Sequence, residues 1–230
     1  MIRGLFEWLR TRRITSLELL LGERRLRNSM TLLESGISCE TLVVAIFSLR
    51  STECLRKADS AYLLTNSHQG VSLRIPDGTQ EIERAAFICC KGLETMSIPR
   101  SVTKIWDHAF SGCRALTSVT LPASLRVIMD RTFSECRALT TVLLPEALSE
   151  IGFQAFCNCS SLRDVTMPSS LRRIKAAAFM FCSSLTELTV PDSVTYMGDD
   201  PFFGCTKLTK LIVPESIAVK SLKAAAVDGV

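Results

Sequence analysis

Seven of the eight prolines in this 230-residue chain stand 23 residues apart. A fixed period of this length is typical of a repeat protein, in which one short structural unit is stacked many times. The sequence therefore predicts a solenoid and argues against a globular enzyme domain. The spaced prolines are Pro76, Pro99, Pro122, Pro145, Pro168, Pro191 and Pro214.

The residues between the prolines recur at fixed distances. Isoleucine or methionine follows each proline by six residues, phenylalanine by eleven, cysteine by fourteen and leucine by seventeen, over six units without an insertion. The phenylalanines, which we expect to form the main core column, are Phe87, Phe110, Phe133, Phe156, Phe179 and Phe202. The cysteines of the repeat are Cys90, Cys113, Cys136, Cys159, Cys182 and Cys205.

Each unit predicts one coil of a parallel stack. Apolar and polar residues alternate from Leu116 to Pro122, which indicates a half-buried strand. Proline ends this strand because it has no backbone N–H to donate. A second short strand is expected near Ile128, and residues 131–136 predict a tight helical or 3₁₀ turn. Neighbouring coils then pair edge to edge at about 4.8 Å.

The ten cysteines allow two interpretations. The pairs Cys89-Cys90 and Cys157-Cys159 could belong to a metal site or a disulfide framework, but neither His68 nor His108 accompanies such a pair. A thiol is also a small apolar group that fits a tight inward position. We favour buried free thiols, which suit a reducing compartment, and expect no metal and no cofactor.

The pattern Leu-x-x-Val-x-Leu-Pro-x-x-Leu-x-x-Ile, then Ala-Phe-x-x-Cys-x-x-Leu, resembles the BspA-like leucine-rich repeats. Its closest stretches are residues 105–116 and 151–162, and the resemblance covers about residues 71–217. It implies a leucine-rich-repeat solenoid of the α/β class, with mainly short parallel strands, tight helical or 3₁₀ turns and a strand-lined concave face. It also implies an interaction or adhesion role, often at a cell surface, and no catalysis.

The chain divides into three predicted parts. Residues 71–217 form the solenoid of six 23-residue repeats, and residues 218–230 a degenerate C-terminal cap, since the period decays there. Residues 1–70 do not fit the period, and their apolar spacing predicts two or three helices between residues 2 and 64. This N-terminal segment is expected to be a helical cap or partly disordered. The alternative is that the basic, amphipathic residues 1–30 bind an anionic membrane or a partner groove.

The outward-facing residues of the longer strands are the predicted partner-binding site. They are rich in hydroxyls, with acidic side chains at Asp164 and Glu187 and exposed apolar ones at Leu143 and Ile212, on one continuous sheet. The alternative is that threonine is simply a good exposed strand residue. The predicted contact residues are Thr95, Ser118, Thr120, Thr141, Leu143, Asp164, Thr166, Glu187, Thr189 and Lys210.

The remaining features limit the function classes. The net charge of +4 is concentrated in the first 30 residues, so the nearly neutral repeats do not predict a nucleic-acid surface. No catalytic triad, phosphate-binding glycine loop or metal cluster is visible, so we expect neither an enzyme nor a small-molecule substrate. No apolar run approaches the ~20 residues of a membrane span, and the start is a poor secretory signal. The sequence thus predicts a scaffold that binds another protein, cytoplasmic by default, with a surface adhesin as the alternative.

Overall fold

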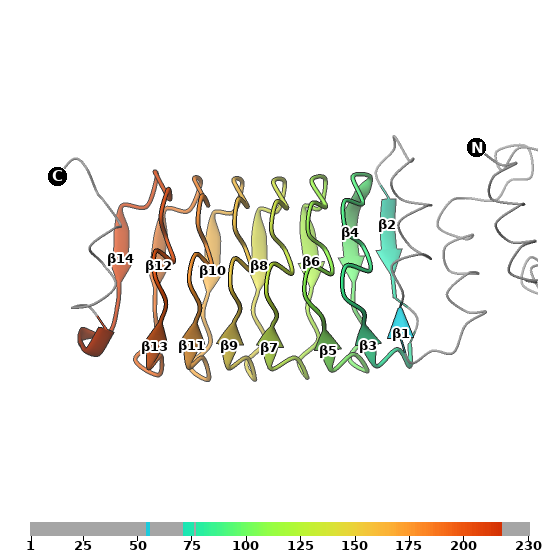
Figure 1. The fold of residues 1–230 in the computed structure, drawn as a ribbon, viewed down its shortest axis with the longest axis horizontal. Coiled ribbons are helices and arrows are strands. Elements are labelled where there is room, and N and C mark those ends of the chain that lie inside the picture. Colours follow the sequence, from blue (N-terminus) through green and yellow to red (C-terminus); the bar gives the residue numbers. More distant parts are fainter. Residues whose placement is uncertain (1–53, 56–70, 76, 218–230) are drawn as a thin grey trace, which may run out of the picture.

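A computed structural model describes residues 54–55, 71–75 and 77–217 of the chain. Within these ranges the backbone winds into a stack of coils, and each complete coil carries one strand on each of two sides (Figure 1). All strand pairs are parallel. The predicted solenoid of short parallel strands is therefore confirmed.

The even-numbered strands form one side of the stack. Their pairing is offset by one repeat, as Asp164 with Thr141 and Thr166 with Leu143 illustrate. Hydrogen bonds join the first five of these strands into one sheet and the last two into another. The prediction of one continuous sheet is thus wrong at one point, between the fifth and sixth even-numbered strands. The even-numbered strands are β2 (Val71–Arg74), β4 (Leu93–Ser97), β6 (Ser118–Thr120), β8 (Thr141–Leu143), β10 (Asp164–Thr166), β12 (Glu187–Thr189) and β14 (Lys210–Ile212).

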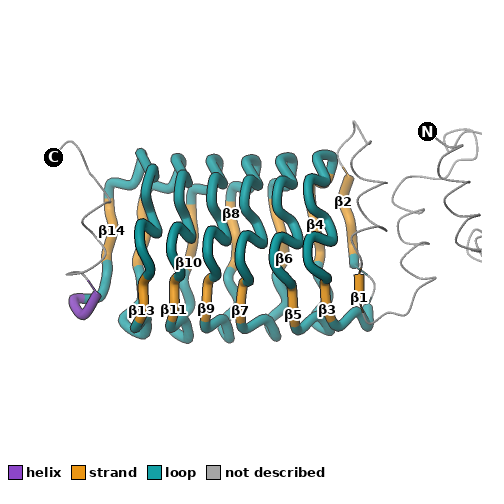
Figure 2. Tube along the Cα trace, in the orientation of Figure 1, coloured by secondary structure: helices purple, strands orange, loops and turns teal. Residues whose placement is uncertain are grey.

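The odd-numbered strands, two residues each, form the other side. They pair into a three-stranded sheet, β1-β3-β5, and a four-stranded sheet, β7-β9-β11-β13. Each complete coil therefore alternates between the two sides, with loops and turns between its strands (Figure 2). The odd-numbered strands are β1 (Cys54–Leu55), β3 (Glu81–Ile82), β5 (Lys104–Ile105), β7 (Val127–Ile128), β9 (Glu150–Ile151), β11 (Arg173–Ile174) and β13 (Tyr196–Met197).

The segment after each odd-numbered strand from β3 onward is a run of β-turns, so the predicted helical or 3₁₀ turn is wrong. Arg131 and Glu135 have positive φ angles of 54° and 63°, which a right-handed helix excludes. The backbone N–H groups also alternate in direction. Phe133 donates to the Ala155 carbonyl of the next coil at 2.8 Å, whereas Ser134 donates back to Arg131 at 3.2 Å. The turns therefore link neighbouring coils as the strands do.

The six described prolines of the repeat, from Pro99 to Pro214, follow the ends of the even-numbered strands, as predicted. Strand β6 ends at Thr120, and Pro122 follows after the buried Leu121. Pro122 cannot donate to a neighbouring coil, but its carbonyl accepts a hydrogen bond from Leu125 N–H at 3.1 Å. Each such proline thus ends pairing on one side and begins the bend towards the other.

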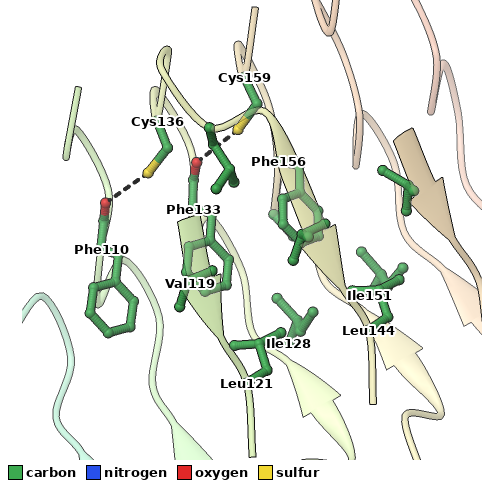
Figure 3. Close-up of a cluster of buried hydrophobic side chains, with 14 of the residues drawn as sticks. Phe110, Val119, Leu121, Ile128, Phe133, Cys136, Leu144, Ile151, Phe156 and Cys159 are labelled. Carbon is green, nitrogen blue, oxygen red and sulfur yellow. Dashed lines mark hydrogen bonds between the residues drawn. The ribbon is translucent and has the colours of Figure 1, made fainter. Parts of the chain in front are cut away.

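The phenylalanine column fills the interior, as predicted (Figure 3). From Phe87 to Phe179, neighbouring ring centroids lie 5.2–5.4 Å apart, with planes within 10° of parallel. The last pair, Phe179 and Phe202, is looser, at 5.9 Å and 23°. Each fully buried ring contributes roughly 1.5–3 kcal/mol before chain entropy is counted.

The cysteine column lies beside the rings and does more than fill space. Cys136 Sγ donates to the Phe110 carbonyl oxygen at 3.2 Å, and Cys159 Sγ to that of Phe133 at 3.1 Å (Figure 3). Each of these bonds joins a coil to the one before it. The expected inward placement is confirmed, with Cys205 only partly buried, but the hydrogen-bonding role was not predicted.

The two ends are described only in part. The predicted N-terminal helices lie outside the described residues, apart from Cys54 and Leu55, which form strand β1 and pair with Glu81 and Ile82 of β3. The predicted cap at 218–230 also lies outside. Among the described residues, helical structure is confined to 215–217 (Figure 2). No described helix has the length and hydropathy to cross a membrane.

Candidate functional site

The outward-facing residues of the even-numbered strands lie along one side of the stack, here called the even-strand face. Side chains alternate between the two sides of each strand. In β6, Val119 points into the core while Ser118 and Thr120 are exposed. Strands β8, β10 and β12 repeat this exposed–buried–exposed pattern. The period-two pattern therefore places the outward residues of these strands in register within each of the two sheets.

The structure places the ten predicted contact residues on this face. Nine are exposed, whereas Thr95 is half-buried, and its hydroxyl donates to that of Ser72 at 2.7 Å. Their shared location is what the sequence predicted, and their role in binding stays a prediction. The nine exposed residues are Ser118, Thr120, Thr141, Leu143, Asp164, Thr166, Glu187, Thr189 and Lys210.

Leu143 is the most exposed apolar side chain on the even-strand face. Its exposed fraction is 79%. In register beside it lie Thr120 of β6 and Thr166 of β10, both exposed. Ile212, in the same column at the C-terminal end of the stack, is 48% exposed, as expected. A large apolar group held in the open by a rigid sheet is the type of group that a partner buries.

The charges of the face are distributed unevenly. Lys210 Nζ lies 3.4 Å from Glu187 Oε2, and both side chains are mostly exposed. Asp164, one strand earlier, is exposed and has no ion pair among the described residues. The two predicted acidic residues are therefore not equivalent: the neighbouring lysine screens one of them, and the carboxylate of Asp164 is open.

The odd-numbered strands carry a charge network that sequence reasoning missed. Lys175 Nζ lies 2.9 Å from Glu150 Oε1 and 3.5 Å from Asp130 Oδ1, two coils away. Gly152 lies in the intervening coil and has no side chain. The hydrogen bond that Lys175 donates to the Glu150 carboxylate, followed by the charge of Asp130, raises the pKa of Lys175. Because Lys175 follows Gly152 by one period, the register could have identified this network.

An exposed aromatic pair on the turns was also missed. Phe181 and Phe203 are 45% and 40% exposed, and their rings meet edge to face at 5.5 Å. Phe181 has a φ of 60°, an unusual conformation for a bulky residue. A Cβ on Gly204 would collide with the Phe181 ring. Glycine at that position therefore makes room for the ring.

The thiols fall into two groups. Burial raises the pKa of Cys113, Cys136, Cys159 and Cys182, and raises that of the partly buried Cys205 to about 11. Outside this column, Cys89 is exposed and Cys157 is intermediate.

The part of the chain that the structure describes holds no group of three His, Cys, Asp or Glu residues placed to bind a metal ion.

The described histidine, His108, lies in the turns. Burial, followed by the charge of Arg131, lowers the pKa of His108.

The chain matches the model of the BspA type leucine rich repeat region over residues 60–183 and 103–226, with six copies. No curated protein matches it. Among solved structures it is similar to a leucine-rich repeat protein of Treponema pallidum, with 36% identity and a TM-score of 0.61, covering 64% of this chain and 71% of that one.

Two further solved structures are similar over a smaller share of their own length. A leucine rich cell surface protein of Faecalibacterium prausnitzii is 30% identical, with a TM-score of 0.58, over 66% of this chain and 41% of that one. The pneumococcal vaccine antigen PcpA is 28% identical, with a TM-score of 0.53, over 62% and 39%. The chain thus corresponds to about two fifths of these two proteins.

Proposed function

Because the chain belongs to the BspA-type leucine-rich repeat family, we propose that it is a non-catalytic interaction protein whose even-strand face binds another protein. One observation carries the proposal: Leu143 is 79% exposed at the centre of this rigid, hydroxyl-rich face. Burial of such a group contributes roughly 1.5–3 kcal/mol to an association. Isolated exposed leucines are common on protein surfaces, so the surrounding residues also matter.

The surroundings of Leu143 suit a protein partner. Exposed threonines can form hydrogen bonds at the rim of an interface. The face also carries charges of both signs, Asp164 and Glu187 against Lys210, which favours neither a nucleic acid nor any other strongly charged polymer. The proposed contact set is the nine exposed residues together with the half-buried Thr95.

The test is affinity capture with the full chain and two surface variants. Thr120→Arg and Thr166→Arg together would place two long side chains on either side of Leu143 and block the face. Ala123→Arg, at an exposed position outside the even-numbered strands, is the matched control. We expect the double variant to lose the captured protein at least tenfold and the control to retain it. Equal capture by all three proteins would place the binding site on another surface.

A second candidate is display at a cell surface, as an adhesin-type protein. The relative from Faecalibacterium prausnitzii is described as a cell surface protein and PcpA as a vaccine antigen. These descriptions support a surface location rather than the cytoplasmic one expected by default. Attachment through residues 1–30, which lie outside the described residues, belongs to this candidate. Antibody labelling of intact and permeabilised cells tests it: labelling only after permeabilisation would exclude surface display.

A further inference from the structure

The chemistry of the partner segment can be inferred from two neighbouring side chains on the even-strand face. Leu143 lies in β8 beside Thr166 of β10, and Asp164 lies two residues before Thr166. The two side chains therefore stand diagonally on adjacent strands. Parallel strands lie about 4.8 Å apart and rise about 3.3 Å per residue, so the two Cα atoms are about 8 Å apart.

Of the two predicted acidic residues, Asp164 is the one whose carboxylate is open to a partner. The neighbouring Glu187 already faces Lys210 at 3.4 Å. Asp164 is exposed, and within the described ranges no lysine or arginine reaches it, including Arg163 beside it in the chain. A partner carboxylate placed here would be repelled by the Asp164 carboxylate, whereas a partner ammonium or guanidinium would be attracted by it.

We propose that the even-strand face binds an extended, cationic segment of a partner protein, with an apolar residue over Leu143 and a lysine or arginine, two residues along, at Asp164. The inference rests on the proposed function. Its geometric basis is that residues i and i+2 of an extended chain point to the same side about 6.6 Å apart. A long basic side chain spans the small remaining distance to the carboxylate. The exposed hydroxyls of Thr141 and Thr166 flank the two anchor positions.

The test is selection of displayed random 12-residue peptides on the immobilised full chain, followed by affinity measurement of the enriched peptides. We expect enrichment of sequences in which a basic residue lies two positions from a large apolar one. Two variants separate the contributions. Leu143→Thr and Asp164→Thr each introduce the residue type that the same column carries in another coil, Thr120 and Thr141 respectively. Both should therefore fold, and a thermal melt checks that they do.

For the enriched peptides, we expect each variant to weaken binding at least tenfold. The binding constant of the wild-type chain should fall with added salt, and Asp164→Thr should remove most of that dependence. As a reversal, Asp164→Lys should select peptides with an acidic residue at the same position. Ser97→Ala, on the same face but three coils away from Asp164, is the control and should bind as the wild type does.

The outcomes distinguish this inference from the proposed function. Peptides that lose binding on Leu143→Thr but show no basic preference and no response to Asp164→Thr would overturn the cationic segment and leave the binding face intact. Peptides that respond to neither substitution, or an absence of enrichment over the bare support, would count against both.

Discussion

The thiol of Cys136 donates a hydrogen bond to the carbonyl oxygen of Phe110, 3.2 Å away in the preceding coil. The same carbonyl accepts the N–H of Cys113 within its own turn. The thiol of Cys136 thus adds a hydrogen bond between coils at a carbonyl that already accepts one within the preceding coil. The arrangement recurs in neighbouring coils, for example from Cys159 to Phe133.

Cys136→Ala should lower the free energy of unfolding by about 1–3 kcal/mol, because it removes this hydrogen bond and leaves a small cavity. Urea denaturation measures the change. Cys157→Ala, at a partly exposed position outside the cysteine column, is the control and should change stability by less than about 0.5 kcal/mol. Equal effects of the two substitutions would contradict a stabilising role for the Cys136 thiol.

Alkylation of the native protein should label Cys89 first among the described thiols, because it is exposed. Cys205 should react more slowly: with its pKa raised from 9.0 to about 11, its thiolate fraction at pH 8 falls about a hundredfold. The fully buried Cys136 and Cys159 should react only when the protein unfolds. Mass spectrometry of iodoacetamide-treated protein measures the order in which the thiols react. Rapid labelling of the thiols of the cysteine column would contradict their burial.

Phe133→Ala should be among the most destabilising single substitutions. Its ring lies between those of Phe110 and Phe156, 5.4 Å from each, and its loss leaves a cavity in the centre of the stack. The expected cost is about 3–5 kcal/mol, measured by chemical denaturation. Phe181→Ala, at a 45% exposed ring, should cost about 1 kcal/mol or less. A melting temperature unchanged by Phe133→Ala would contradict the stacked core.

Glu135 should make a small, pH-dependent contribution to stability. The hydrogen bond from Asn158 at 2.7 Å, aided by Arg137, lowers the pKa of Glu135 below its ordinary 4.5, against the opposing effect of burial. A carboxyl with a lowered folded-state pKa stabilises the protein above about pH 4.5. This contribution is lost as the pH falls through the folded-state value.

Glu135→Gln should therefore destabilise the protein at pH 7 and have progressively less effect below pH 4.5. Urea denaturation at pH 7 and pH 3 measures the difference, with Glu146→Gln, at an exposed position, as the control. A Glu135→Gln effect that stayed constant over this range would assign the cost to packing rather than to charge.

The strands were predictable because their signals are local. Alternation around Val119 and the missing N–H of Pro122 are properties of single residue types. The turns were not predictable in the same way. Their left-handed positions hold Arg131, Glu135 and even Phe181, whereas the usual indicator of such a conformation is glycine.

The candidate site was also predictable only in part. Alternation predicted that Leu143 and Asp164 are exposed, and the 23-residue register could have predicted the contact of Lys210 with Glu187. The break in the sheet between β10 and β12 depends on backbone hydrogen bonds that no side-chain pattern reports. Sequence therefore located the face well and described its electrostatics and continuity incompletely.

The alternating hydrogen bonds of the turns have a consequence for cooperativity. Phe133 N–H reaches only the next coil, and Cys136 Sγ only the previous one. The described array therefore behaves as a one-dimensional system, in which stability is set by each coil and its two interfaces. Opening should begin at the looser Phe179–Phe202 end and move inward, so amide hydrogen exchange should be slower in the coils around Phe133 than in the coil of Phe202. Leu143 and Asp164 belong to these tightly stacked coils, so the centre of the candidate binding face should stay folded when the Phe202 end opens.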